Sequence, residues 1–373
     1  MFSKVMHTLL VLTVVLVAVF NTDTMAAERY RERLRLGHSQ GNPPPKKILR
    51  VVTTLPDYAV LTKTIGGDRV NVQSIVHPIQ DPHHIRPKPS FVHMVMNADM
   101  VVSTGLDLEM WLPTVINKSG NKRIRSSEIG YVAVAHGMQL LEKPEVVSQA
   151  EGDVHVYGNP HIMCSPIKVR QAAGNIAIGL IKNDPEGKAF YEENLKNLQN
   201  EIDERLFGEE LVKLLGGETL CRLAEQDKLI EFLNSKNLGG KPLIDKLGGW
   251  MKKMMPLRGS AIVVYHKNWS YLLQLFGLQE GATIESKPGI PPSPKHVANL
   301  VTMMQDRQMG IILAANYFDQ EKVKTVAART GAEAVIVPLF VGGVPGADNN
   351  FKLMDYWVDK LTTAAKNKGM IKE

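Results

Sequence analysis

Residues 70–90 read VNVQSIVHPIQDPHHIRPKPS, an apolar segment followed by a loop that contains four prolines. Residues 70–76 are predicted to form a buried strand, and the prolines that follow cannot continue a sheet ladder. A loop stiffened in this way holds its side chains in place, and His83 lies in its middle. We therefore expect His83 to contribute to a binding site at the end of a strand.

One order of elements occurs twice along the chain. Strands alternate with helices in both halves, and the predicted strands are residues 48–53, 70–76, 100–103 and 131–135, then 261–265, 282–285, 309–314 and 334–339. Such alternation is typical of parallel sheets with right-handed crossovers. We predict an α/β fold with two lobes, each containing a parallel four-stranded sheet flanked by helices.

A helical segment separates the two halves. Residues 167–181 and 186–206 are predicted to be helical, and the second range carries apolar side chains at helical spacing. We expect a long, rigid helix that joins the lobes, with the binding site in the cleft between them. One continuous doubly wound sheet is the alternative, which this separating segment disfavours. The predicted parts are an N-terminal lobe at 48–184, a connecting helix with an extra helical block at 185–257, and a C-terminal lobe at 258–373.

The first residues have the pattern of a secretory signal peptide. Lys4 and His7 precede an apolar run at residues 9–20, and two alanines follow at a plausible cleavage site. The run is shorter than the roughly 20 residues that span a bilayer, so we predict a cleaved signal over residues 1–27 and a periplasmic protein. Residues 28–47 are rich in arginine and proline and are predicted to be a disordered arm.

Composition and cysteine content restrict the function only in part. The net charge of +6 is spread along the chain and lies partly in the arm and signal, so no nucleic-acid partner is expected. Cys164 and Cys221 could form a disulfide in an oxidising compartment or remain as buried thiols, and the sequence leaves both possibilities open. The segment at residues 208–258 has no functional interpretation from its sequence.

Three histidines occupy similar positions beside predicted strands or helices. His83 follows the second strand, His266 follows the first strand of the second half, and His161 precedes a helix within Asn-Pro-His. A single histidine is most often a structural residue. Three together at such positions indicate a metal site, because neutral imidazole is a common zinc ligand and ligands can come from distant parts of a chain.

These motifs resemble those of the zinc/manganese-binding substrate-binding proteins of ABC transporters. The resemblance rests on Asp-Pro-His at 81–83, Asn-Pro-His at 159–161 and Tyr-His at 265–266, together with Ile-Gly-Gly-Asp-Arg-Val at 65–70. It extends over residues 48–360, interrupted at 208–258. It implies two α/β lobes joined by a rigid helix, with His83, His161 and His266 as metal ligands.

The sequence also departs from the family pattern. Members often supply an acidic fourth ligand from the second lobe, but residues 313–317 and 336–339 contain no carboxylate there. We expect three imidazoles with a water molecule, or a fourth ligand drawn from Glu285, Asp348 or Cys164. Manganese prefers oxygen ligands, so this donor set favours Zn²⁺ as the transported ligand over manganese.

Other histidines receive lesser roles. His155 stands in the region where zinc-binding members carry a histidine-rich loop, and could recruit metal at the mouth of the cleft. His136 is a candidate for a supporting position beside the ligands, whereas the remaining histidines of interest are expected to be solvated, surface or capping residues, namely His84, His93 and His296.

The resemblance implies a non-enzymatic, monomeric protein that binds zinc and delivers it to an integral-membrane ABC permease. A zinc-dependent hydrolase is one alternative, because three histidines and an open position also describe catalytic zinc, but no HExxH motif or comparable carboxylate accompanies them. The other alternative is an adhesive or structural protein whose lobes are locked by the metal.

Overall fold

A computed structural model describes residues 47–144 and 155–371 of the chain. The predicted signal peptide and most of the predicted arm lie outside the described residues. Residues from Ile48 onward form one compact unit. No helix in the described ranges is both long and apolar enough to cross a membrane.

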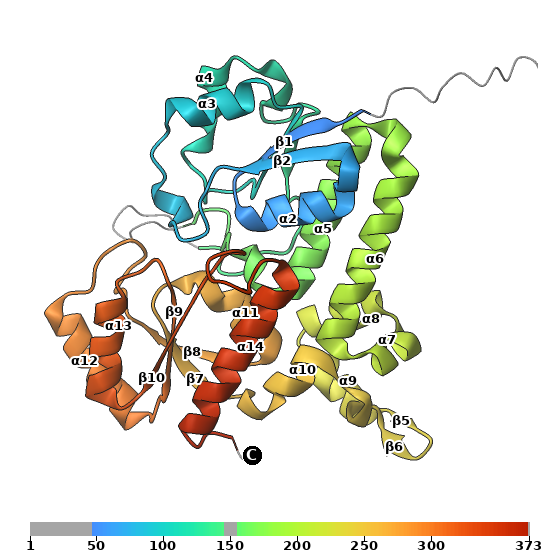
Figure 1. Cartoon of the computed structure of the whole chain (residues 1–373). Helices are drawn as coiled ribbons and strands as arrows, with labels where there is room; N and C mark the ends of the chain where they lie inside the picture. The colour runs from blue at the N-terminus through green and yellow to red at the C-terminus, as the bar shows by residue number, and fades with distance from the viewer. Residues whose placement is uncertain (1–46, 145–154, 372–373) are drawn as a thin grey trace, which may run out of the picture. The chain divides into compact units, whose positions relative to one another are not determined.

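The first lobe contains a parallel four-stranded sheet in the order β2-β1-β3-β4. Its strands are β1 (Leu49–Thr53), β2 (Val70–Ser74), β3 (Met100–Ser103) and β4 (Tyr131–Ala133). Helices α2 (Pro56–Gly66), α3 (Pro89–Met96) and α4 (Leu112–Ser119) connect them (Figure 1). All four residues of β3 are buried, as expected for a central strand of a parallel sheet covered on both faces.

The second lobe repeats this arrangement. Its parallel sheet has the order β10-β9-β7-β8, formed by β7 (Ala261–Val264), β8 (Gln279–Thr283), β9 (Ile311–Ala315) and β10 (Glu333–Val337). The flanking helices are α11 (Ser270–Phe276), α12 (Pro294–Asp306), α13 (Gln320–Thr330) and α14 (Asn350–Asn367). In both lobes the first strand lies between the second and the third. The predicted α/β fold with two parallel four-stranded sheets is confirmed.

The connecting segment consists of two packed helices. Helix α5 (Pro166–Asn183) ends near Asp184, and the long helix α6 (Lys188–Phe207) runs antiparallel to it between the lobes (Figure 1). The buried Asp184 carboxylate accepts two hydrogen bonds from Arg69, at 2.7 and 3.0 Å, and one from the Tyr191 hydroxyl at 2.6 Å. This network fixes the turn between α5 and α6 to the first lobe.

The extra helical block packs against the connecting helices. It contains α7 (Glu209–Leu215), α8 (Gly217–Glu225), α9 (Leu229–Ser235), a short hairpin of β5 (Asn237–Leu238) and β6 (Lys241–Pro242), and α10 (Gly249–Met254). Ion pairs join it to α5, from Lys168 to Glu225 at 2.7 Å and from Arg170 to Glu218 at 2.8 Å. Cys164 and Cys221 are both buried free thiols, so they do not form the disulfide that the sequence left open.

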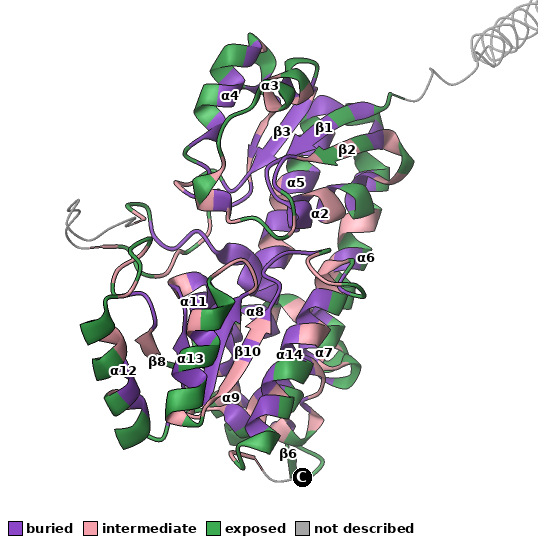
Figure 2. Ribbon diagram, turned by 60° about the vertical axis from the view of Figure 1, so that its left-hand side comes forward, coloured by how far each residue is buried: buried purple, intermediate pink, exposed green. Residues whose placement is uncertain are grey.

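Burial is continuous across the unit (Figure 2). The inner strands and the inward faces of α5 and α14 are buried, whereas the outer faces of α12 and α13 are exposed. One hydrophobic cluster includes residues of both lobes and of the connecting helices, so the two lobes share a core.

A buried carboxylate joins the lobes directly. Asp57, at the start of α2, is 1% exposed. Its side chain accepts hydrogen bonds at 3.3 Å from the backbone N–H of Val341 and from Nδ2 of Asn350, both in the second lobe. Burial raises the pKa of Asp57 to about 7, although the bond from the backbone N–H of Val341 opposes the shift.

We predict that this carboxylate makes stability depend on pH. Between about pH 4 and pH 7 the unfolded chain releases the Asp57 proton and the folded chain retains it, so the free energy of unfolding falls as pH rises through this range. In Asp57→Asn this titration is absent. The free energies of unfolding of the metal-free variant and wild type are measured with urea at pH 4 and at pH 7. From pH 4 to pH 7 the stability of the variant relative to wild type should rise by on the order of 3 kcal/mol. A difference that does not change with pH would contradict this assignment.

Candidate metal centre

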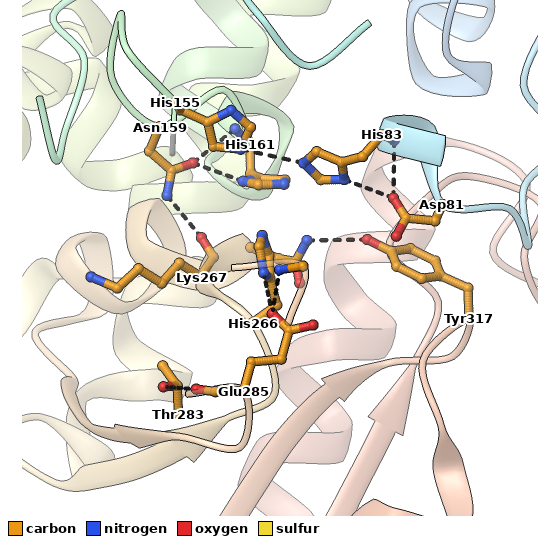
Figure 3. A network of polar contacts seen from close by, with 12 residues as sticks. Asp81, His83, His155, Asn159, His161, His266, Lys267, Thr283, Glu285 and Tyr317 are labelled. Carbon is orange, nitrogen blue, oxygen red and sulfur yellow. Dashed lines mark hydrogen bonds and ion pairs between the residues drawn. The ribbon is translucent and has the colours of Figure 1, made fainter. Parts of the chain in front are cut away.

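Four histidines converge where the two lobes meet. One ring nitrogen from each of His83, His155, His161 and His266 lies within 4.8 Å of the others (Figure 3). The three histidines predicted from the sequence are therefore brought together, and His155 joins them. His161 and His266 are buried, whereas His83 and His155 are half-buried.

His83 is positioned by the loop that follows β2. It lies in the single 3₁₀ turn η2 (Pro82–His84). The Asp81 carboxylate accepts from the backbone N–H of His83 at 3.0 Å and contacts its Nδ1 at 2.7 Å. The indole N–H of Trp111 donates to the carbonyl of Pro82 at 2.9 Å, which ties the turn to the first lobe.

The same local arrangement positions His161. Asn159 stands two residues before it, and the Asn159 Oδ1 is 2.9 Å from both the backbone N and the Nδ1 of His161. The Asn159 Nδ2 donates to the carbonyl of Lys267 at 2.8 Å, in the second lobe. Asp-Pro-His and Asn-Pro-His are therefore equivalent motifs: a side chain oxygen at the first position holds both the backbone and the ring of the histidine.

His266 follows β7 and is held by Glu285, which follows the neighbouring strand β8. The distance from His266 Nδ1 to the Glu285 carboxylate is 2.7 Å, and Glu285 is 8% exposed. The backbone N–H of Glu285 donates to the carbonyl of Tyr265 at 3.0 Å. Adjacent parallel strands thus bring the ring and its acceptor to the same edge of the sheet.

His155 is held from the first lobe. Its Nδ1 lies 3.0 Å from one Asp107 carboxylate oxygen, and the other oxygen accepts from the backbone N–H of Val156 at 2.8 Å. Its Nε2 is 3.3 Å from the Nε2 of His83. Asp107 lies in the loop after β3, so the carboxyl ends of two strands of this sheet position histidines.

These contacts orient all four rings in the same sense. Each Nδ1 faces an oxygen acceptor, which favours the tautomer with a proton on Nδ1 and a lone pair on Nε2. The Nε2 atoms of His161 and His266 are buried and have no hydrogen-bond partner among the described residues. A buried polar atom without a partner is costly, and a metal ion at the centre of the four rings would satisfy these atoms.

The surroundings favour the neutral form of His161 and His83. Burial lowers the pKa of His161 well below its ordinary value, and the neighbouring histidines act in the same direction. Burial also lowers the pKa of His83, although the bond to Asp81 opposes the shift. Neutral imidazole is the form that binds metal, so the site is prepared for a cation at neutral pH.

The three residues predicted as possible fourth ligands, Glu285, Asp348 and Cys164, do not belong to this cluster. Glu285 is directed at the ring of His266 instead of serving as an additional donor. The Asp348 side chain is 64% exposed and forms an ion pair with Lys352 at 2.9 Å. Cys164 is buried, and burial raises the pKa of its thiol well above the ordinary value. The sequence assigned His155 only to metal recruitment, whereas the structure places it within the cluster.

The other histidines singled out in the sequence lie outside the cluster. His296 lies in α12 with its Nε2 3.1 Å from the carbonyl of Thr283, and its backbone N–H donates to the side chain of Ser293, which caps this helix. His93 and His136 are exposed, and neither belongs to the cluster. His84 neighbours His83, but its ring centre is 6.1 Å away from that ring and it is likewise outside the cluster.

Known proteins share both the sequence pattern and the fold. The manganese ABC transporter substrate-binding lipoprotein PsaA of Streptococcus anginosus is 22% identical over 317 residues, which cover 84% of this chain and 88% of PsaA. The high-affinity zinc uptake system protein ZnuA of Bacillus subtilis is 22% identical over 298 residues, 79% of each chain.

Solved structures support the fold. A crystal structure of ZnuA superposes with a TM-score of 0.61 at 20% identity, covering 85% of this chain and 99% of that chain. The substrate-binding protein FpvC of Pseudomonas aeruginosa, solved in complex with Mn²⁺, superposes with a TM-score of 0.59 at 20% identity, covering 86% and 99%.

A family profile described as "Zinc-uptake complex component A periplasmic" matches residues 51–205 and 242–364. The unmatched residues 206–241 include α7, α8, α9 and β5 of the extra helical block, whereas α10 lies within the matched range. The match covers both sheets and most of the chain, and the chain belongs to the family of periplasmic zinc-uptake component A proteins.

Proposed function

We propose that this protein binds Zn²⁺ through His83, His155, His161 and His266 and delivers it to an integral-membrane ABC permease. The observation that carries the proposal is the set of four imidazoles whose ring nitrogens lie within 4.8 Å of one another, two of them buried without a partner among the described residues. The family membership supports it, since the named relatives are substrate-binding proteins of metal transporters.

The donor set supports zinc over manganese. Four imidazole nitrogens suit a four-coordinate tetrahedral ion, whereas manganese favours carboxylate and carbonyl oxygen. The carboxylates around the cluster, from Asp81, Asp107 and Glu285, face Nδ1 atoms on the outer side of the rings. After β9, Tyr317 presents a phenol at a place where members of the family often supply an acidic ligand. Its hydroxyl accepts from Asn268 at 3.1 Å and lies beside Asp81 (Figure 3).

No observation favours the alternative functions. A hydrolytic zinc enzyme needs an open coordination position and a carboxylate free to act as base. Here four imidazoles surround the site, and the nearby carboxylates are engaged with those imidazoles. The relatives are transporter proteins, which agrees with a non-enzymatic role. Export to the periplasm, a monomeric state and release to the permease are parts of the same proposal.

We predict that replacing any of the four histidines by alanine weakens zinc binding by more than the roughly 10–100-fold typical of an outer-shell partner. Each change removes one of four donors from the cluster. The measurement is a competition with a chromogenic zinc chelator at pH 7.5. His84→Ala is the matched control, since His84 adjoins a ligand but lies outside the cluster, and should retain full affinity. Unchanged affinity in His155→Ala would remove His155 from the site.

A second prediction concerns the carboxylate behind His266. In Glu285→Gln the ring keeps an acceptor but loses its anionic partner, so zinc affinity should fall by roughly tenfold. Glu333→Gln is the control, because Glu333 contacts Asn367 at the far end of the second sheet. Calorimetric titration of both variants at one pH gives the comparison. Equal affinity in the two variants would show that Glu285 does not support the metal site.

The third prediction concerns selectivity. The protein, equilibrated with equal concentrations of Zn²⁺ and Mn²⁺ and then desalted, should retain zinc almost exclusively, because its donors are nitrogen atoms. Elemental analysis provides the measurement. Retention of manganese in equal or greater amount would contradict the zinc assignment while leaving a metal-transport role intact.

A further inference from the structure

The groups behind the four clustered rings are not equivalent. A carboxylate faces Nδ1 of His83, His155 and His266, whereas Nδ1 of His161 faces the neutral amide oxygen of Asn159 at 2.9 Å. A carboxylate raises the basicity of a metal-ligating imidazole, and a neutral acceptor does so less. His161 therefore lacks the direct anionic partner that the other three rings have.

A carboxylate, that of Glu142, lies directly behind Asn159. The Asn159 Oδ1 holds the backbone and ring of His161, and its Nδ2 donates to Glu142 Oε2 at 2.9 Å. An anion that accepts from the N–H end of an amide polarises the amide, so the amide oxygen becomes a stronger acceptor. Carboxylate, amide and imidazole thus form a chain through which the charge of Glu142 can act on His161.

The other oxygen of Glu142 contacts the second lobe. Its Oε1 accepts from the Ser270 hydroxyl at 3.2 Å and from Lys267 Nζ at 3.3 Å. Lys267 directly follows His266, and its carbonyl accepts from Asn159 Nδ2 at 2.8 Å (Figure 3). Glu142 therefore joins the segment that holds one clustered histidine to the segment that contains another.

The backbone of Glu142 is held in an unfavourable conformation. Its φ is +53°, in the left-handed region that a residue other than glycine rarely occupies. The other three non-glycine residues with positive φ in the described ranges lie in hydrogen-bonded turns, whereas Glu142 does not. The preceding Leu141 accepts from the Asn159 backbone N–H at 2.8 Å. Backbone conformations of this kind persist where surrounding contacts impose them, often at functional sites.

Exposure distinguishes the two kinds of contact that Glu142 makes. Its side chain is 33% exposed and that of Lys267 is 44% exposed, and an ion pair open to water in this way contributes little. Asn159 is 2% exposed, so its hydrogen bond to Glu142 is shielded from water at one end. A hydrogen bond in such surroundings is electrostatically stronger. The contact with Asn159 is therefore the one through which Glu142 can affect the site.

We propose that Glu142 is a positioning residue for metal binding, which acts through Asn159 on His161 and strengthens that ring as a zinc ligand. The inference rests on the proposed zinc function and adds to it a carboxylate that is not part of the Asn-Pro-His motif. Glu142 itself lies outside the histidine cluster. With Glu142 included, each of the four rings has a carboxylate behind it, three directly and the fourth through an amide.

A double-mutant cycle tests whether Glu142 acts through Asn159. Zinc affinity is measured by chelator competition in wild type, Glu142→Ala, Asn159→Ala and the double variant. Glu142→Ala should weaken zinc binding roughly tenfold in the wild-type background. In the Asn159→Ala background the same change should have an effect of at most about twofold, because the link to His161 is already lost. Equal losses in both backgrounds overturn the proposal.

Glu280→Ala is the matched control for charge. Glu280 is a partly exposed carboxylate that pairs with the same lysine, Lys267, at 3.8 Å, but it accepts no hydrogen bond from Asn159 in the described structure. Its replacement should change zinc affinity by no more than about twofold. Equal losses in Glu142→Ala and Glu280→Ala would show that only the net charge near the site matters, which contradicts the proposed role of the Asn159 contact.

Glycine at position 142 separates metal affinity from the stability of the fold. Glycine readily adopts positive φ, so Glu142→Gly removes the carboxylate while the backbone keeps its conformation without strain. The melting temperature of the metal-free chain should stay within about 3 °C of wild type. Zinc affinity should still fall roughly tenfold.

The outcome for Glu142→Gly also separates this inference from the proposed function. If wild type binds zinc and Glu142→Gly binds it equally well, the inference fails while the proposed function stands. If wild type does not bind zinc, the proposed function fails, and the inference fails with it.

Discussion

Four imidazole rings meet at the junction of the lobes with their Nε2 atoms directed at one another, and much of the surrounding structure serves to hold them there. Two of these nitrogens are buried without partners among the described residues, an arrangement that is unfavourable in the absence of a cation. A side chain oxygen holds each of the four Nδ1 atoms, so the rings cannot easily turn to give the buried Nε2 atoms a hydrogen-bond partner. The cost of assembling the cluster is offset when an ion binds.

The fold explains how residues far apart in sequence reach one point. Parallel strands end at a common edge, and the loops after β2, β3 and β7 carry His83, the Asp107 that holds His155, and His266. His161 precedes α5, the first of the connecting helices, so the link between the lobes supplies this donor. The shared core and the Asp57 contact keep the lobes together around the cluster.

The sequence was sufficient for the fold and for three of the four clustered histidines, because those features are local. Alternating strands and helices predict the sheets, and Asp-Pro-His and Asn-Pro-His indicate fixed histidines. His155 could not be assigned in this way, since the described residues that follow it, 156–161, form no helix or strand and its place depends on Asp107, 48 residues earlier. Glu285 was expected among possible ligands. Whether a carboxylate contacts the metal or the ring beside it depends on a 2.7 Å contact that spacing does not encode.

The central claim is that four imidazoles form the metal site. X-ray absorption spectroscopy of the zinc-loaded protein at neutral pH tests it most directly, because the method separates sulfur from lighter donor atoms and counts imidazole rings by their multiple scattering. The account predicts four nitrogen scatterers at about 2.0–2.1 Å with the multiple-scattering pattern of imidazole and no sulfur. A multiple-scattering pattern that fits only two or fewer imidazole rings, or sulfur at about 2.3 Å, would contradict it.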